Sequence, residues 1–329
     1  MQRIAIVGMG LIGGSIGLGL RQWSARNGNS LRIVGFDDDL DKQSRARKMG
    51  AVDDTEWSLT KAVAEADIVI IATPVGAMRQ VFDDIGPHLK VNAVVTDTGS
   101  TKADVLRWAE RLPDHVDFVG GHPMAGKSES LAAADANLFR GATWVICPSV
   151  RAGEPAVRNV LGIVGALEAE SFFVDPSEHD SYVAGISHLP FVAAAALMRA
   201  TASDSAWRDM KTLSSTGFKD TTRLALGNPE MHRDILLTNR EAVARWIDTY
   251  VQTLLTVKAT LLATDDGAPD QLLEFFAEAQ DERARVEVQE ARGSEQGGSA
   301  DGGTNRENVS EHMGRMFLGG LGKRRKTPR

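Results

Sequence analysis

Short apolar segments alternate with amphipathic ones over the first half of this 329-residue chain. The apolar segments are rich in β-branched residues and are bounded by Gly, Pro or Asp, as is typical of buried strands. They comprise residues 3–8, 31–37, 67–73, 93–97, 117–120, 143–147 and 171–175. Most are separated by segments with helical periodicity, at 11–25, 39–49, 75–85, 102–111 and 154–167. This alternation predicts an α/β fold, a doubly wound parallel sheet with helices on both faces.

The strand-like segments stop near residue 175, and the sequence beyond that point has helical character. Residues 177–201 predict a long Ala-rich helix that is interrupted or bent near Pro190. An apolar stripe at helical spacing over 230–264 fits either a core or, in part, a dimer face. We therefore predict an α/β domain at 1–175, an all-helical domain at 176–290 and a tail at 291–329. The tail is expected to be flexible because 291–305 is rich in Gly, Ser and Glu.

A GMGLIG motif joins the first predicted strand to the first predicted helix. Gly8 permits a tight turn, Gly10 lets the backbone approach a pyrophosphate, and Gly13 allows the helix to pack closely on the strand. The phosphates then meet the positive end of the helix dipole. Together with the flanking strand and helix, the motif predicts a Rossmann-like dinucleotide-binding domain. The cofactor-binding residues expected here are Gly8, Gly10, Leu11, Ile12 and Gly13.

Asp37 ends the second predicted strand, near the position where this fingerprint carries an acidic residue. Its carboxylate would accept hydrogen bonds from the adenine ribose and repel a 2′-phosphate, which favours NAD over NADP. The alternative is that Asp37 only begins the next turn, a role that Asp38 or Asp39 can also fill. Thr73 and Pro74 follow another strand and are expected to line the same cofactor crevice.

His122 lies in the sequence GGHPMAG, directly after a predicted strand. A histidine titrates near neutrality and can take a proton from a hydroxyl while hydride leaves the same carbon. The glycines allow close approach of a ligand and Pro123 stiffens the exit, although an ordinary loop histidine is the alternative. Ser100 follows a neighbouring strand and is expected to serve the site, because Thr101 is better placed to cap the next helix.

Composition and charge exclude several classes of protein. The single cysteine, Cys147, permits no intramolecular disulfide and fits a reducing cytoplasm. A net charge of −7 argues against a nucleic-acid-binding protein. The N-terminus enters a strand at once, which argues against a signal peptide, and the wholly apolar runs are far shorter than the ~20 residues that span a bilayer. No Cys/His spacing is zinc-like, so we expect no metal. From the short apolar runs and the single cysteine we expect no membrane association and a cytoplasmic location.

Several motifs, in their order along the chain, resemble the prephenate/arogenate dehydrogenase family of tyrosine biosynthesis. They are GMGLIGGS, DTGSTK, GGHPMAG, HDSYVAGISHLP and GFKDTTRLALGNPEMHRDI, and they span roughly residues 1–265. The resemblance implies a Rossmann domain followed by a helical dimerisation domain, and hence a homodimer. It also implies an NAD-dependent oxidative decarboxylation. Hydride leaves the ring carbon that bears the hydroxyl, the ring carboxylate leaves as CO2, and the ring becomes aromatic.

The resemblance assigns roles to individual residues. His122 corresponds to the catalytic histidine that bonds the ring hydroxyl, and Ser100 to the serine that positions this hydroxyl and the nicotinamide. Arg223 corresponds to the arginine that binds a substrate carboxylate, for which a guanidinium fork is well suited. The alternative for Arg223 is a surface ion pair with Asp220 or Glu230.

His179 and His188 match histidines of the family's helical domain, where they serve the substrate or the structure. Two positions depart from the family. Phe191 stands where HLPH has its second histidine, and the glutamate that follows GHPMAG is displaced by one residue to Glu129. Both positions bear on the substrate side chain.

Prephenate, which carries a keto acid side chain, and arogenate, which carries an amino acid, therefore both remain possible substrates. We expect conversion of prephenate to 4-hydroxyphenylpyruvate, CO2 and NADH, with conversion of arogenate to tyrosine as the alternative. A β-hydroxyacid dehydrogenase is less consistent, because neither Lys211 nor Lys219 lies in the lysine motif of that family. A catalytically silent NAD-binding regulator is the non-enzymatic alternative. No ACT-type regulatory pattern follows Thr264.

Overall fold

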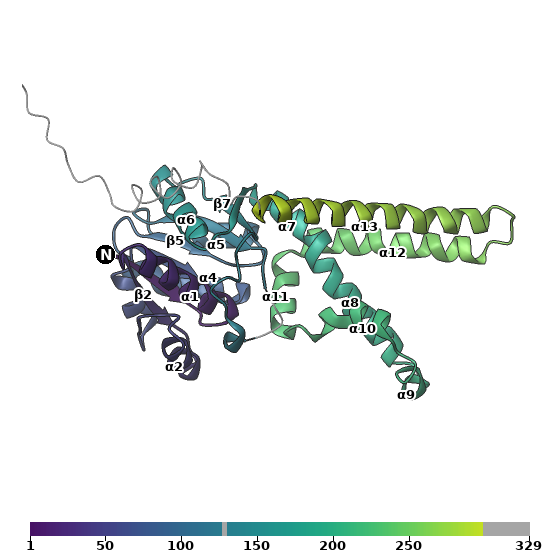
Figure 1. The fold of residues 1–329 in the computed structure, drawn as a ribbon, viewed down its shortest axis with the longest axis horizontal. Helices are drawn as coiled ribbons and strands as arrows, with labels where there is room; N and C mark the ends of the chain where they lie inside the picture. Colours follow the sequence, from purple (N-terminus) through teal and green to yellow (C-terminus); the bar gives the residue numbers. More distant parts are fainter. Residues whose placement is uncertain (127–129, 299–329) are drawn as a thin grey trace, which may run out of the picture. The chain divides into compact units, whose positions relative to one another are not determined.

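The computed structural model describes residues 1–126 and 130–298 (Figure 1). It divides into two compact units, Met1–Ala244 and Arg245–Arg329. The first unit contains the whole sheet and the helices up to α11. The second is described only to Gly298.

An eight-stranded sheet forms the centre of the first unit, in the order β3-β2-β1-β4-β5-β6-β7-β8. All neighbouring strands are parallel except β6 and β7. The predicted α/β fold is confirmed, but the expectation of a parallel sheet is wrong at β7 and β8, which run opposite to the other strands. The strands are β1 (Gln2–Val7), β2 (Leu31–Phe36), β3 (Asp54–Thr55), β4 (Ile68–Ile71), β5 (Val94–Asp97), β6 (Asp117–Pro123), β7 (Thr143–Pro148) and β8 (Glu170–Phe173).

The direction of β7 follows from the connection that precedes it. A parallel neighbour needs a crossover, usually a helix, to return the chain to the same end of the sheet. The described part of the β6–β7 connection contains only the 3-10 turn η2 (Leu131–Ala133), so β7 runs back along β6. Strand β3 was not predicted because two polar residues, Asp54 and Thr55, give no apolar run.

Helices cover both faces of the sheet and enclose a core on each. One core includes Ile16 of α1 and Ile163 of α6. The other includes Phe82 of α4, Val105 of α5 and Ile235 of α11. Strand β4 is buried throughout, as expected for a parallel strand covered on both faces. The helices are α1 (Leu11–Arg26), α2 (Leu40–Lys48), α3 (Leu59–Ala64), α4 (Val75–Ile85), α5 (Ala103–Ala109) and α6 (Glu154–Ala166).

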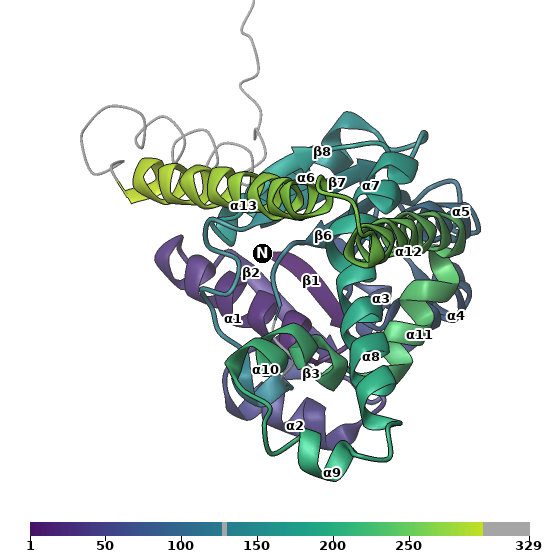
Figure 2. The ribbon, with the colours of Figure 1, turned by 90° about the vertical axis from the view of Figure 1, so that its right-hand side faces the viewer.

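The helical part of the first unit begins with α7 (Pro176–Val183), the π-helical turn η3 (Ala184–His188) and α8 (Leu189–Ala202). The interruption predicted near Pro190 is confirmed as this π-helical turn, and Pro190 then occupies the first turn of α8, where its missing N–H costs no helical bond. The chain continues through α9 (Trp207–Met210), α10 (Thr216–Thr222), η4 (Arg223–Leu226) and α11 (Pro229–Thr238). Helix α11 packs against α4 (Figure 2).

The stretch Pro176–Ala202 is the one helix in the described part of the chain that is long and apolar enough to cross a membrane. It is tied into the first unit by its buried polar residues His179, Asp180 and His188. Asp180 contacts the start of α5, both Asp180 and His188 contact Asn239, which follows α11, and His179 contacts His122 of β6. Such contacts are those of a helix packed on an α/β unit.

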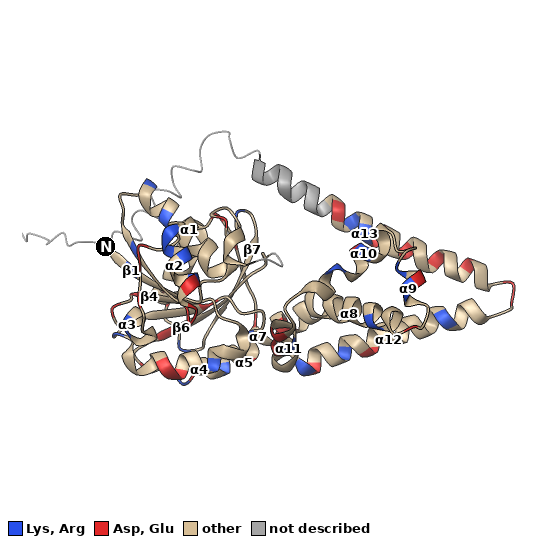
Figure 3. Ribbon diagram, turned by 90° about the horizontal axis from the view of Figure 1, so that it is seen from below, with Lys and Arg blue, Asp and Glu red and all other residues tan. Residues whose placement is uncertain are grey.

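Helix α12 (Arg240–Leu262) leads into the second unit, where α13 (Ala268–Gly298) follows. Acidic and basic residues are interspersed along both helices (Figure 3). The apolar stripe predicted here begins with the buried Val243, at 3%, but Leu254 at 51% and Leu261 at 66% are exposed in the described part of the chain, so this later part of the stripe is not core there. The linker expected from residue 291 is wrong as far as 298, because α13 continues to Gly298. Residues 299–329 lie outside the described part.

Candidate functional site

The glycine-rich loop between β1 and α1 has the geometry that its sequence predicts. Gly8 has a φ of +100°, and a Cβ there would lie 2.6 Å from the carbonyl oxygen of Ala72. A Cβ at Gly13 would overlap the carbonyl oxygen of Gly8, whereas a Cβ at Gly10 would have no atom within 4 Å among the described residues other than its chain neighbours. Helix α1 begins at Leu11 with no side-chain cap and no acidic residue in its first turn. Its free N–H groups and positive dipole end therefore fit an anion such as a pyrophosphate.

Asp37 lies beside this loop. Its carboxylate accepts hydrogen bonds from the backbone N–H of Met9 at 2.8 Å and of Asp39 at 2.9 Å. Asp39, rather than Asp37, caps helix α2, because its side chain accepts from the backbone of Asp41 and Lys42. Each oxygen of Asp37 retains capacity for another hydrogen bond. Asp37 is therefore placed to accept from ribose hydroxyls at the end of β2.

Three hydroxyl or ring groups lie at the ends of the neighbouring strands β4 and β5. The Thr73 hydroxyl is buried without a partner among the described residues. Ser100 is half-buried, and no hydrogen bond of its hydroxyl is found in the described part of the chain. Pro74 is exposed and precedes the first turn of α4. Buried hydroxyls without partners are uncommon in folded proteins, so Thr73 points to a bound group or water.

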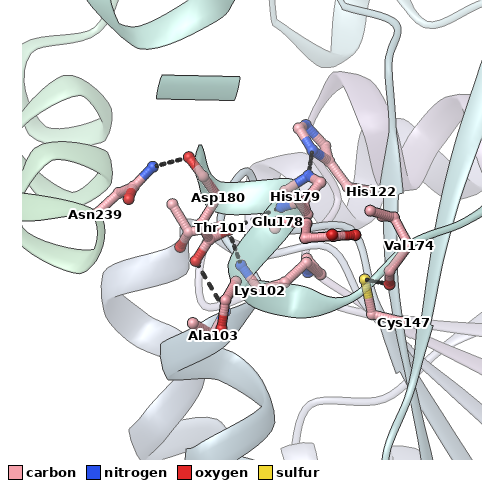
Figure 4. Close-up of polar contacts among 12 residues, drawn as sticks. Thr101, Lys102, Ala103, His122, Cys147, Val174, Glu178, His179, Asp180 and Asn239 are labelled. Carbon is pink, nitrogen blue, oxygen red and sulfur yellow. Dashed lines mark hydrogen bonds and ion pairs between the residues drawn. The ribbon is translucent and has the colours of Figure 1, made fainter. Parts of the chain in front are cut away.

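His122 is the end of a hydrogen-bonded row of side chains (Figure 4). It lies within β6 rather than after it, because the strand continues to Pro123 and pairs His122 with Val145. Its Nδ1 lies 2.9 Å from Nε2 of His179, and Nδ1 of His179 lies 2.8 Å from Oδ1 of Asp180. All three side chains are buried. The structure thus brings His179 to His122, and adds Asp180, which sequence reasoning missed.

The order of partners assigns the protons in this row. An ionised Asp180 can only accept, so His179 donates from Nδ1 and accepts at Nε2. His122 must then donate from Nδ1, which leaves a lone pair on its Nε2. Burial lowers the pKa of His122 well below its usual range, and the positive charge of Lys102 acts in the same direction. His122 is therefore neutral near pH 7 with a free acceptor, as a general base requires.

Asp180 also joins this row to the loop that carries Ser100. Its carboxylate accepts from the backbone N–H of Lys102 at 2.7 Å and of Ala103 at 2.9 Å, at the start of α5. The expectation that Thr101 caps α5 is wrong, because its hydroxyl donates to Thr238 Oγ1 instead. The cap comes from a distant helix, which no local pattern could indicate. The only sequence signal was that an acidic residue directly follows His179.

His188 is buried behind the same cluster. Its Nδ1 lies 3.2 Å from Nδ2 of Asn239, which also donates to the Asp180 carbonyl oxygen. Its Nε2 is buried with no partner among the described residues, and burial lowers its pKa to about 4. Phe191 is buried and stacks on His232, with ring centroids 4.1 Å apart. A phenyl ring stacked on an imidazole thus occupies the position where the family motif has its second histidine.

Arg223 begins η4 and is exposed. The alternative of an ion pair with Asp220 or Glu230 is not found in the described part of the chain. No hydrogen bond or ion pair joins Arg223 to the histidine cluster among these residues either. The displaced Glu129 lies outside the described residues. Within 1–126 and 130–298 no group of three or more His, Cys, Asp or Glu side chains could hold a metal ion.

Two family models match this chain. The model of the prephenate dehydrogenase nucleotide-binding domain matches residues 17–172, and that of the prephenate dehydrogenase dimerization domain matches residues 175–278. A prephenate dehydrogenase from Bacillus subtilis is 34% identical over 284 residues, which cover 85% of this chain and 75% of that protein.

Two solved structures are also similar to this chain. A prephenate dehydrogenase from Aquifex aeolicus, in complex with hydroxyphenyl propionate and NAD+, has a TM-score of 0.80 and 30% identity and covers 87% of this chain and 98% of its own. An arogenate dehydrogenase from Synechocystis has a TM-score of 0.72 and 26% identity and covers 87% of this chain and 100% of its own.

Proposed function

Because this chain belongs to the prephenate dehydrogenase family, we propose that it catalyses the NAD-dependent conversion of prephenate to 4-hydroxyphenylpyruvate, CO2 and NADH. The observation that carries the proposal is the buried row from Asp180 through His179 to His122, which leaves one imidazole nitrogen free to accept a proton. Arogenate, which would give tyrosine, is the alternative substrate.

The side chains divide the chemistry as follows. Nε2 of His122 accepts a hydrogen bond from the ring hydroxyl. It takes up the hydroxyl proton as hydride leaves the same carbon, so His122 becomes positively charged. Asp180 stabilises that charge through His179. Ser100 orients the hydroxyl, and Arg223 binds a carboxylate of the substrate. As the C–CO2 bond breaks, its electron pair enters the ring, and the proton held by His122 returns to the phenolic oxygen.

We propose NAD as the cofactor, which accepts the hydride when bound. The glycine-rich loop and the start of α1 would hold its pyrophosphate, and Asp37 its adenine ribose. Thr73 and Pro74 would line the nicotinamide side. The open space at Gly10 and the uncapped start of α1 support this assignment.

Two glycine substitutions separate cofactor binding from folding. Gly10→Ala is expected to leave the melting temperature unchanged, because its Cβ meets nothing in the free protein, but to weaken NADH binding at least fivefold by filling the pyrophosphate site. Gly13→Ala should lower both the melting temperature and the NADH affinity, because its Cβ overlaps the backbone of Gly8. NADH fluorescence titration and differential scanning fluorimetry measure the two effects. Wild-type NADH affinity in Gly10→Ala would contradict the assigned site.

Substrate choice is tested by side-by-side rates. We expect the absorbance at 340 nm to rise when protein, NAD and prephenate are mixed, and more slowly with arogenate. A higher kcat/KM for arogenate would replace prephenate by the alternative substrate. Silence with both compounds, from protein that still binds NADH, would contradict the proposed activity and favour an NAD-binding regulator.

We propose that the protein is a cytoplasmic homodimer. The match to a dimerization domain and the exposed apolar residues of α12 and α13 support a second copy as the partner. The buried, unpaired Cys147 suits a reducing compartment. A division of function at residue 175, with the substrate domain over 176–290, is supported by the point at which the two family models meet.

A further inference from the structure

Asp97 and Lys102 form an ion pair beneath the candidate site, and both side chains are fully buried. Asp97 is the last residue of β5, and Lys102 directly precedes α5. Buried ion pairs are seldom more stabilising than apolar residues of similar volume. The position of this pair therefore calls for a local explanation.

The carboxylate of Asp97 binds the backbone next to both groups proposed to act on the hydroxyl. Its Oδ1 accepts from the backbone N–H of Gly121 at 3.0 Å, and its Oδ2 accepts from that of Gly99 at 2.7 Å. Gly99 precedes Ser100, and Gly121 precedes His122. One side chain thus links the Ser100 loop to the His122 strand.

These contacts require an ionised carboxylate and two glycines. Oδ2 accepts from Lys102 Nζ as well as from Gly99, and Oδ1 accepts from Gly121. An amide at position 97 would replace one of these oxygens by an NH2 group, which cannot accept from the donors that face it. A Cβ at Gly99 would lie 2.8 Å from Asp97 Oδ2, and one at Gly121 would lie 2.6 Å from the Asp97 carbonyl oxygen. The backbone is therefore close enough to Asp97 to exclude any side chain at both positions.

Asp180 provides a second link between the Ser100 loop and His122. It holds the backbone of Lys102 and Ala103 on the far side of Ser100, and it reaches His122 through His179. The loop that carries Ser100 is thus held on both sides by buried carboxylates, each of which also leads to His122. Asp180 acts on the His122 ring, whereas Asp97 acts on the backbone beneath it.

We propose that Asp97, with its charge balanced by Lys102, is a positioning residue that sets the separation between Ser100 and His122. The proposal rests on the proposed function, because that separation matters only if both groups act on one hydroxyl. Asp97 is fully buried, so its effect must pass through the Ser100 loop and the His122 strand that it holds together.

A double-mutant cycle between Asp97→Asn and Ser100→Ala tests this, with kcat, the prephenate KM and NADH affinity measured for each protein. We expect each single change to lower kcat about tenfold or more, while the NADH dissociation constant stays within about threefold. In the Asp97→Asn background, Ser100→Ala should then cost less than about threefold, since residues that act together are non-additive. Additive losses would overturn the positioning role.

Asp67→Asn is the matched control. Asp67 also accepts a hydrogen bond from a neighbouring strand, from Arg3 N at 2.7 Å, and forms an ion pair with Lys90. It precedes β4, however, so it lies at the amino end of that strand, opposite the end that carries the candidate site. Its effect should add to that of Ser100→Ala. If Asp97→Asn unfolds because it leaves Lys102 unpaired, the cycle is run in Asp97→Asn/Lys102→Met. There, restored folding with restored kcat would overturn the proposal.

The same measurements distinguish a failure of the Asp97 role from a failure of the proposed enzyme activity. An active wild type with additive losses removes only the role of Asp97. A wild type that turns over neither prephenate nor arogenate overturns both the proposed function and this role.

Discussion

His122→Asn should reduce turnover by ~10²-fold or more, the usual scale for loss of a general base, while NADH affinity stays close to that of the wild type. Asn can donate a hydrogen bond to His179, but its amide oxygen cannot take up a proton at neutral pH. Because His122 lies within a buried strand, outside the glycine-rich loop, cofactor binding has no reason to change. Initial rates at 340 nm and an NADH titration give the two quantities.

The pH dependence provides a second measurement of the same residue. Burial lowers the pKa of His122 below its ordinary value of 6.5, so the neutral, active form persists as the pH falls through 6.5. The kcat/KM of the wild type should decline only at more acid pH. The exposed His88 provides the control, as His88→Asn should leave both rate and profile unchanged. A near-normal rate in His122→Asn would refute the assigned role.

Asp180→Asn is expected to cost a comparable ~10²-fold in kcat, although Asp180 contacts no reacting atom. If the amide turns its N–H toward His179, the proton of His179 moves to Nε2 and that of His122 must follow to its own Nε2. The nitrogen that should accept from the hydroxyl is then blocked. The negative charge that stabilises protonated His122 is lost as well.

The same substitution weakens the start of α5, because one oxygen cannot accept from Lys102, Ala103 and His179 together. We expect a loss of about 1 kcal/mol in unfolding free energy, the size of a helix cap. The control is Asp175→Asn, since Asp175 caps α7 and Asn caps equally well. Retention of more than a tenth of wild-type kcat in folded Asp180→Asn protein would rule out the relay.

The elements of the nucleotide-binding part were largely predictable, because they are encoded by local patterns. Continuous apolar runs indicated β1, β4 and β5, and the GMGLIG sequence located the turn in which Gly8 needs a positive φ. The local sequence patterns failed to predict a strand without an apolar run and a strand direction that depends on a connection. Strand β3 has no apolar run, and the antiparallel direction of β7 depends on the β6–β7 connection, whose described residues form no crossover helix.

The candidate site was predictable in part. His122, Ser100 and Asp37 were found because each follows or ends a predicted strand, and parallel strands bring their carboxyl ends to one edge. Asp180, Asn239 and Asp97 were missed, because their partners lie far away in sequence or are backbone groups. Thr101 was misassigned as a cap for the same reason.

The sequence by itself therefore determined most of the strands and helices, the position of the glycine-rich loop and the choice of His122 as the candidate proton acceptor. These depend on periodicity, on backbone angles open only to glycine, and on side-chain chemistry. Only the tertiary structure decided which nitrogen of His122 is free and what holds Ser100 in register with it. Those properties arise when α7 brings His179 and Asp180 against β6 and the start of α5, and buried polar groups must then satisfy one another.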